Sequence, residues 1–157
     1  MKMLAIVLSL LIVVSVVSAE PVVVIVRHAE KADNSEDAEL SAAGRARAEI
    51  LSRILKDANI TAIFTSERKR TQQTAEPLSK STGVAPTVVP AKEYSVLVSK
   101  LRDVKGNAMV VGHGNTIPEL VKALGIETPV QIADADYSEI FIVTLDSKPQ
   151  LMRLHYP

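Results

Sequence analysis

The strongest structural signal in this sequence is the run Val22-Val23-Val24-Ile25-Val26-Arg27-His28-Ala29-Glu30-Lys31. Its first five residues are all β-branched, which is typical of a strand buried on both faces in the middle of a parallel sheet. The strand stops at an arginine followed by a histidine. In an open α/β sheet the carboxyl ends of the strands face the ligand crevice, so we expect Arg27 and His28 to reach one site together.

The composition suits one compact domain and excludes several classes of protein. The chain has 157 residues, of which 47% are hydrophobic, and its 18 basic side chains balance its 18 acidic ones. Such a chain can bury a core of its own. Zero formal charge gives no electrostatic reason to bind nucleic acid or an anionic membrane surface. The absence of cysteine excludes disulfides, thiolate catalysis and cysteine-ligated metal.

Residues 1–19 have the composition of a signal peptide. Lys2 supplies a short positive region, residues 3–17 are almost all aliphatic, and Val17-Ser18-Ala19 offers the small residues that a signal peptidase needs. The alternative is an uncleaved membrane anchor, but the apolar run is short for a bilayer span and the first strand follows it with no linker. We therefore expect an exported protein, periplasmic or secreted, that consists of residues 20–157 and has no stable membrane anchor after cleavage.

Strands and helices alternate along the rest of the chain. The sequence predicts strands at residues 22–26, 60–65, 86–90 and 107–112, with the third nearer an edge, and a closing pair at 139–145 and 150–155. Helices are expected at residues 41–56, 66–81, 92–103 and 116–124. This alternation predicts an α/β fold: a three-layer α/β/α sandwich around a mostly parallel, mixed sheet.

Local signals indicate how several helices begin and end. Ser41 and Ser66 are suitable N-caps, and Thr116-Ile117-Pro118-Glu119 has the pattern of a capping box with proline in the first turn. Pro77 should kink the second helix or end it early, and Gly83 suits a left-handed cap after it. The helical repeat assigns the inner face of the first helix to Ala43, Ala46, Ile50, Leu51, Ile54 and Leu55.

Chemically useful side chains follow three of the predicted strands. Arg27 and His28 follow the first, Arg70 comes shortly after the second, and His113 follows the fourth. At one sheet edge, beside helix amino termini, these groups suit a dianionic phosphate, because arginine forks bind its oxygens and a histidine attacks phosphorus or donates to an oxygen. A metal site is the competing interpretation. It fits poorly, because no H-x-H or H-E-x-x-H spacing occurs and Arg27 would repel a divalent cation.

Four segments, in chain order, resemble the histidine phosphatase superfamily, the phosphoglycerate mutase-like clan. Arg27-His28-Ala29-Glu30 is similar to its R-H-G-E signature, with alanine where glycine is usual, and Leu40-Ser41-Ala42-Ala43-Gly44 to its L-[ST]-x-x-G helix opening. The segment from Ser66 to Ala75 resembles S-x-x-x-R-x-x-Q-T-A, and Gly112-His113-Gly114 resembles its G-H-G segment. The resemblance extends over residues 20–157 and implies a phosphoglycerate mutase-like fold.

The resemblance also implies roles for individual residues. His28 would be the nucleophile that forms a phosphohistidine, and Arg27, Arg70 and His113 would form the phosphate pocket and stabilise charge on the phosphoryl oxygens. Asn34 occupies a position where the family often has a phosphate-binding asparagine, although a simple turn residue is an equal alternative. Ala29 is compatible with the signature if that position does not need a positive φ.

The general acid is less clearly marked. Family members often carry a glutamate shortly after the third strand, and Glu93 is the only glutamate near that point. Acidic residues in the loop after His28 are the alternatives: Asp33, Glu36 and Asp37. Glu30 is expected to orient the histidine loop.

Together these observations predict a metal-independent phosphatase without a cofactor. It would hydrolyse phosphomonoesters through a phosphohistidine on His28, with a phosphorylated small molecule or envelope component as substrate. Two alternatives remain: a phosphohistidine-protein phosphatase, whose nitrogen leaving group needs no strong acid, and a non-catalytic module that only binds phosphate ligands.

Overall fold

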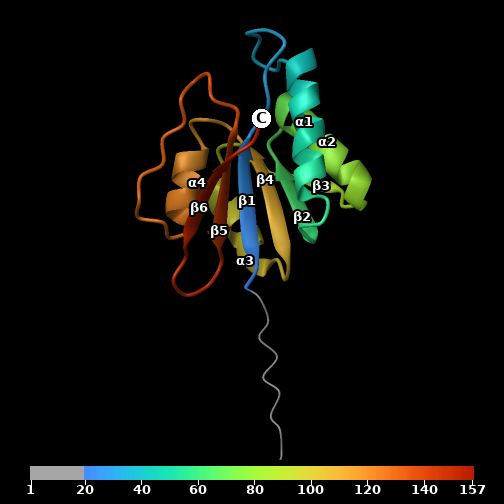
Figure 1. Cartoon of the computed structure of the whole chain (residues 1–157). Coiled ribbons are helices and arrows are strands. Elements are labelled where there is room, and N and C mark those ends of the chain that lie inside the picture. The colour runs from blue at the N-terminus through green and yellow to red at the C-terminus, as the bar shows by residue number, and fades with distance from the viewer. Residues whose placement is uncertain (1–19) are drawn as a thin grey trace, which may run out of the picture.

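A single six-stranded sheet forms the middle layer of the computed structural model, which describes residues 20–157 (Figure 1). The predicted signal peptide, residues 1–19, lies outside the described residues. The strands are β1 (Val22–Arg27), β2 (Ile60–Thr65), β3 (Pro86–Val88), β4 (Asn107–Gly112), β5 (Glu139–Thr144) and β6 (Leu151–His155). No helix within residues 20–157 is long and apolar enough to span a bilayer.

The strand order places β1 in the interior of the sheet. The order is β3-β2-β4-β1-β5-β6, in which β3, β2, β4 and β1 pair in parallel while β5 and β6 add an antiparallel hairpin. Val23, Val24, Ile25 and Val26 are at most 3% exposed, as a strand covered on both faces requires. The predicted mixed sheet, with its third strand at an edge and its closing hairpin, is confirmed.

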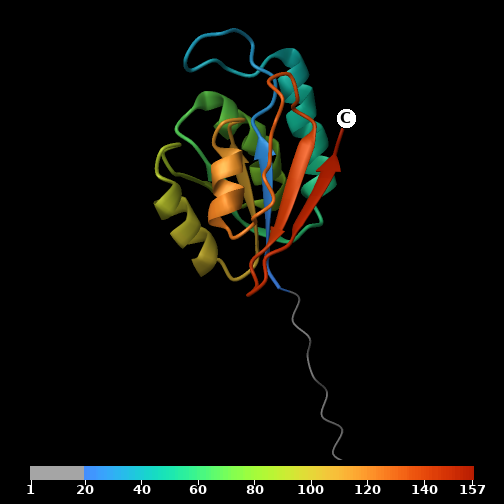
Figure 2. The same ribbon diagram turned by 90° about the vertical axis from the view of Figure 1, so that its left-hand side faces the viewer.

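Two pairs of helices cover the two faces of the sheet (Figures 1 and 2). The helices are α1 (Ala42–Leu55), α2 (Lys69–Thr82), α3 (Tyr94–Asp103) and α4 (Ile117–Ala123). Leu51 of α1 and Leu78 of α2 share one core with Val24, whereas Leu101 of α3 and Leu120 of α4 pack with Val23 and its neighbours on the other face. Alternate residues of β1 therefore serve both cores, and the predicted three-layer sandwich is confirmed.

The inner face of α1 differs from the predicted one. Its buried residues are Gly44, Ala48, Leu51, Ser52 and Leu55, whereas Ala43, Ala46 and Ile54 are exposed. A β-carbon at Gly44 would collide with the backbone oxygen of Glu30, so only glycine allows this approach. The helix therefore packs on its glycine side, a contact that apolar periodicity alone does not reveal.

Three predicted helix-end features are also corrected, while two are confirmed. Ser41 caps α1 by accepting from Gly44 N–H at 3.1 Å, and Gly83 ends α2 with a φ of 75°. Pro77 lies inside α2 without ending it, because the helix continues through buried Leu78 to Thr82. Ser66 is not the cap of α2, because the helix begins only at Lys69; its hydroxyl accepts from Arg68 N–H at 3.2 Å and also binds His113. Thr116 stands at the N-cap of α4 but makes no side-chain cap bond, because its hydroxyl accepts from His113 N–H.

Candidate active site

The two histidines of the predicted site come together because their strands are neighbours. β1 and β4 pair with Arg27 opposite Gly112, and the backbone N–H of His28 donates to the carbonyl oxygen of Gly112 at 2.9 Å. His28 and His113 are thus the first residues beyond two aligned strands. Their ring centroids lie 5.3 Å apart, with the ring planes inclined by 62°. The predicted convergence of the histidines at this sheet edge is confirmed.

His28 is held in one tautomer with a free ring nitrogen. The residue is 4% exposed, and its Nδ1 lies 2.8 Å from the carbonyl oxygen of Ala29. Because a carbonyl oxygen only accepts, Nδ1 carries the hydrogen and Nε2 keeps its lone pair. The pKa of His28 falls to about 4, mainly through burial and then through the charges of His113, Arg70 and Arg27, against the opposing Ala29 bond. At pH 7 the ring is neutral and nucleophilic.

His113 is also buried, and a serine hydroxyl holds its ring. Its Nε2 lies 2.9 Å from Ser66 Oγ, and Ser66 Oγ lies 2.9 Å from the hydroxyl oxygen of Thr71. Burial, followed by the charge of Arg70, lowers the pKa of His113 to about 4. The other ring nitrogen, Nδ1, makes no hydrogen bond within residues 20–157, so it is available to a ligand. Sequence reasoning treated Ser66 only as a helix cap, although its place at the start of the S-x-x-x-R segment was a usable signal.

Arg27 is held in place by the connection between α4 and β5, a segment in which the sequence analysis predicted no functional residue. Its Nη1 donates to the carbonyl oxygens of Ala133, Asp134 and Asp136 at 3.0, 2.8 and 3.0 Å. The guanidinium carbon also lies 4.3 Å from the ring centroid of Tyr137, whose ring is 6.1 Å from that of His28. The connection between α4 and β5 therefore fixes the position of Arg27 and forms a wall beside His28.

Arg27 and Arg70 share a feature that points to an anionic ligand. Arg70, in the first turn of α2, donates from Nη1 to the carbonyl oxygen of Glu36 at 2.8 Å. The Nε–H of each arginine is buried yet has no hydrogen-bond partner among residues 20–157. Buried donors without partners are rare and call for an explanation, and an oxyanion would supply acceptors. Burial, with the nearby charge of Arg68, also lowers the pKa of Arg70.

The loop that carries His28 is fixed from its far side. Ala29 is fully buried, and its N–H donates to Thr74 Oγ1 at 3.0 Å. Its φ is not positive, because Asn59 is the only non-glycine residue with a positive φ within residues 20–157, so alanine fits this position. Glu30 accepts from Arg47 Nε with both carboxylate oxygens, at 2.9 and 3.0 Å. Burial raises the pKa of Glu30, but the bonds from Arg47 outweigh it and lower the pKa overall.

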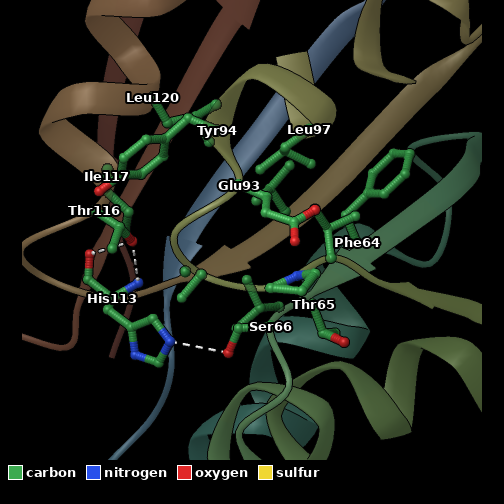
Figure 3. A pocket seen from close by; sticks show the side chains of 16 residues that line it. Phe64, Thr65, Ser66, Glu93, Tyr94, Leu97, His113, Thr116, Ile117 and Leu120 are labelled. Carbon is green, nitrogen blue, oxygen red and sulfur yellow. Dashed lines mark hydrogen bonds between the residues drawn. The ribbon is translucent and has the colours of Figure 1, made fainter. Parts of the chain in front are cut away.

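Glu93 lies on the His113 side of the site. It is the residue before α3, it is exposed, and it lines one pocket together with Ser66 and His113 (Figure 3). Its carboxylate makes no hydrogen bond within the described part of the chain. Glu93 therefore places a carboxylate on the same pocket as His113, without a hydrogen-bond partner among residues 20–157.

The three alternative acids in the loop after His28 have structural partners. Asp33 accepts from the N–H of Ser35 at 2.7 Å, Glu36 binds Arg68 Nη2 at 2.7 Å, and Asp37 accepts from the N–H of Lys69 at 2.9 Å. Asn34 is exposed in the same loop and makes no hydrogen bond within residues 20–157. Its role in binding phosphate stays a prediction.

A group of possible metal ligands lies elsewhere among residues 20–157. Ligand atoms of Asp136, Glu139 and His155 lie within 4.8 Å of one another. Glu139 is paired with Arg153, which already supplies a positive charge at this cluster. Neither His28 nor His113 belongs to the group.

Comparisons with known proteins agree with this geometry. The family model described as histidine phosphatase superfamily, branch 1, matches residues 23–93. The fold is similar to that of a mycobacterial glucosyl-3-phosphoglycerate phosphatase, with 17% identity, a TM-score of 0.72, and coverage of 88% of this chain and 100% of that one. It is also similar to the protein histidine phosphatase SixA in complex with tungstate, with 22% identity, a TM-score of 0.73, and coverage of 85% and 96%. No curated protein sequence matches significantly.

The family assignment rests on sequence and fold together. The matched residues contain Arg27, His28, Arg70 and Glu93, and β4 adds His113 to them in space. The predicted family and its phosphoglycerate mutase-like fold are confirmed. Over residues 23–93 this chain matches the histidine phosphatase superfamily, and its fold is similar to that of solved phosphatases.

Proposed function

We propose that this protein is a metal-independent phosphatase that hydrolyses phosphomonoesters through a phosphohistidine on His28. One observation carries the proposal: two neutral histidines lie at one end of the sheet with buried Nε–H donors of Arg27 and Arg70 that have no partner in the described part of the chain. The donors suit a dianion, and the free Nε2 of His28 suits attack on its phosphorus.

His113 would act as a donor to the bound phosphoryl group. Near pH 7 the oxygens of a phosphate group accept hydrogen bonds. A bound phosphoryl group therefore selects the tautomer of His113 that carries its hydrogen on Nδ1. In that tautomer Nε2 accepts from the hydroxyl of Ser66, which lies 2.9 Å away. Ser66 is thus a positioning residue, because it fixes which edge of the His113 ring carries the proton.

The reaction then has two balanced steps. Nε2 of His28 attacks phosphorus, and the bond from phosphorus to the ester oxygen breaks with its electron pair passing to that oxygen. Glu93 donates a proton to the same oxygen, and the alcohol leaves. Water next attacks the phosphohistidine while Glu93 takes its proton, the N–P electron pair returns to Nε2, and inorganic phosphate leaves. Arg27 and Arg70 stabilise the charge on the phosphoryl oxygens in both steps.

Hydrolysis of an aryl phosphate in the presence of EDTA tests this proposal. We expect turnover that resists EDTA and is lost in His28→Ala, with a matched His155→Ala variant as control because His155 is exposed on β6. Protein quenched during reaction with a ³²P-labelled ester should carry a label that is stable in base and lost in acid, as a phosphohistidine is. No label that survives acid is expected. Equal turnover in wild type and His28→Ala would refute the proposal. Phosphate binding without any turnover would instead support the non-catalytic module.

A phosphohistidine-protein phosphatase is the second candidate, since the fold is similar to that of SixA, a protein histidine phosphatase. The free carboxylate of Glu93 favours esters, because a nitrogen leaving group needs no strong acid. Glu93→Gln distinguishes the two: ester hydrolysis should fall by about 10²-fold or more, while hydrolysis of a phosphohistidine peptide should change little. An equal loss on both substrates would remove Glu93 from the role of general acid.

We also propose that the protein acts after export, on a phosphorylated small molecule or envelope component. The support is the composition of residues 1–19, with its short positive start, aliphatic run and small residues before Glu20. Cell fractionation with amino-terminal sequencing tests it. Mature protein that begins at Glu20 outside the cytoplasm is expected, whereas an intact Met1 in the cytoplasm would contradict it.

A further inference from the structure

Three side chains with metal-binding groups meet at the open end of the hairpin that β5 and β6 form. They are Asp136, Glu139 and His155, and their ligand atoms lie within 4.8 Å of one another. Glu139 and His155 stand directly opposite each other in the antiparallel pair, so their side chains project from the same face of the sheet. Asp136 lies in the connection that leads into β5. The mechanism proposed above uses none of these three side chains.

Glu139 has a buried carboxylate oxygen without a partner. Its side chain is 3% exposed, and its Oε1 accepts from both Nε and Nη2 of Arg153. The other oxygen, Oε2, is buried and makes no hydrogen bond with any group of residues 20–157. A buried carboxylate oxygen in this state is costly, and a bound cation would remove that cost. The unpartnered oxygen therefore points to a ligand at this cluster.

Ser138 orients the other two side chains of the cluster. Its hydroxyl oxygen lies 2.7 Å from Oδ1 of Asp136 and 3.1 Å from Nδ1 of His155. The backbone N–H of Ser138 donates to the same Oδ1 at 2.8 Å. Hydrogen bonds of this kind hold metal-binding side chains in position and are part of the design of protein metal sites.

The charges at the cluster favour a cation in spite of Arg153. Two carboxylates outweigh this one guanidinium, whose Nη2 also donates to the carbonyl oxygen of Gln131 at 3.2 Å. An imidazole with two carboxylates suits zinc, whereas magnesium prefers oxygen ligands alone. The ligands of one zinc ion lie about 3 to 4 Å apart, because its bonds are about 2.1 Å long. His155 is exposed, so its ring can rotate by the small amount that closes this span.

We propose that Asp136, Glu139 and His155 bind one zinc ion, with water completing its coordination. The ion ties the connection between α4 and β5 to both strands of the hairpin. The backbone oxygen of Asp136 accepts from Nη1 of Arg27 at 3.0 Å, so the ion stabilises the segment that holds this arginine. Both histidines of the active site lie outside the cluster, and EDTA removes zinc from the turnover test above. The zinc site and the phosphatase reaction therefore stand or fall separately.

Proton NMR of the histidine rings tests the site in the intact protein. The chain has only three histidines, so each ring signal is assigned by replacing one histidine at a time with asparagine. Zinc is added near pH 7 to protein that has been stripped with EDTA and dialysed. The signal of His155 should shift, whereas those of His28 and His113 should stay in place. A His155 signal that does not move would overturn the proposal, whatever the other two signals do.

Calorimetric titration with zinc measures the affinity in matched variants. Binding should be about 100-fold or more weaker in His155→Ala and about tenfold weaker in Ser138→Ala, since even groups that only orient a ligand change metal affinity by such factors. Leu154→Ala is the control, because Leu154 is the adjacent, exposed residue of β6 on the opposite face; its affinity should equal that of wild type. Thermal melts in EDTA check that each variant is folded. Equal affinity of wild type and His155→Ala, or no measurable binding to wild type, would overturn the proposal.

Discussion

Acidification from pH 7 to pH 4.5 should destabilise the native protein through His28 and His113. Both side chains have a pKa of about 4 in the folded chain, against an ordinary value of 6.5. Between pH 6.5 and pH 4 both histidines are mostly protonated in the unfolded chain and mostly neutral in the folded chain. Unfolding therefore becomes more favourable as the pH falls from about 6.5 to about 4, and this contribution stops growing below pH 4.

The size of the effect follows from the two pKa values. At pH 4.5 an unfolded histidine is almost fully protonated, whereas each folded one is only about a quarter protonated, which corresponds to about 2.5 kcal/mol per residue. The residues are 4% and 7% exposed, so solvent screens little of this difference. For both together the loss reaches about 5 kcal/mol, comparable with the whole stability of an ordinary domain.

Urea unfolding at several pH values between 7 and 4.5 measures this loss. Carboxylates with lowered pKa values, such as Glu30 and Asp136, destabilise in the same direction, so the informative quantity is the difference between variants. The double variant His28→Asn/His113→Asn should lose about 5 kcal/mol less than wild type over this range, while His155→Asn should follow wild type. Parallel curves for wild type and the double variant would refute the argument that burial holds these two rings neutral.

Two further predictions concern residues that hold the site in place. Gly44→Ala should lower the free energy of unfolding, measured in urea, by about 3 kcal/mol, because its β-carbon would meet the backbone of Glu30. Gly83→Ala should lower it by only about 1 kcal/mol, because that position has open space and only its φ of 75° is unfavourable. Equal losses in the two variants would contradict the steric argument. Ser66→Ala should lower kcat about tenfold with little change in KM, because His113 loses the hydrogen-bond partner of its Nε2. The pH profile of kcat should also shift. An unchanged pH profile would show that Ser66 has only a structural role.

The order and type of the elements were predictable because their signals are local. The β-branched run at residues 22–26 predicts an interior strand, and Ser41 and Gly83 mark helix ends through interactions within a few residues. Alternation of strands and helices then leaves few topologies. The convergence of Arg27, His28 and His113 follows in the same way, because aligned parallel strands end at one edge.

Details that depend on contacts across the chain were not predictable. Gly44 faces Glu30 across a close approach that no periodicity records, so the prediction for the inner face of α1 was right for Leu51 and Leu55 but wrong for Ala43, Ala46 and Ile54. Pro77 was expected to disturb α2, yet packing of Leu78 and its neighbours carries the helix past it. Ser66 was interpreted as a helix cap, but α2 begins three residues later and the Ser66 hydroxyl binds the ring of His113, which is distant in sequence.

The sequence by itself determined the resemblance to the family, the order of the sheet strands and which side chains are candidates for the site, because motifs and strand patterns depend on neighbouring residues. Only the tertiary structure decided the environment of those side chains. The clamp that residues 133–138 place on Arg27, the serine on His113, the neutral state of both histidines and the pocket beside Glu93 all join segments far apart in the chain. Burial and hydrogen bonding are properties of the packed molecule, and they set the pKa values and therefore the chemistry of the side chains in a motif.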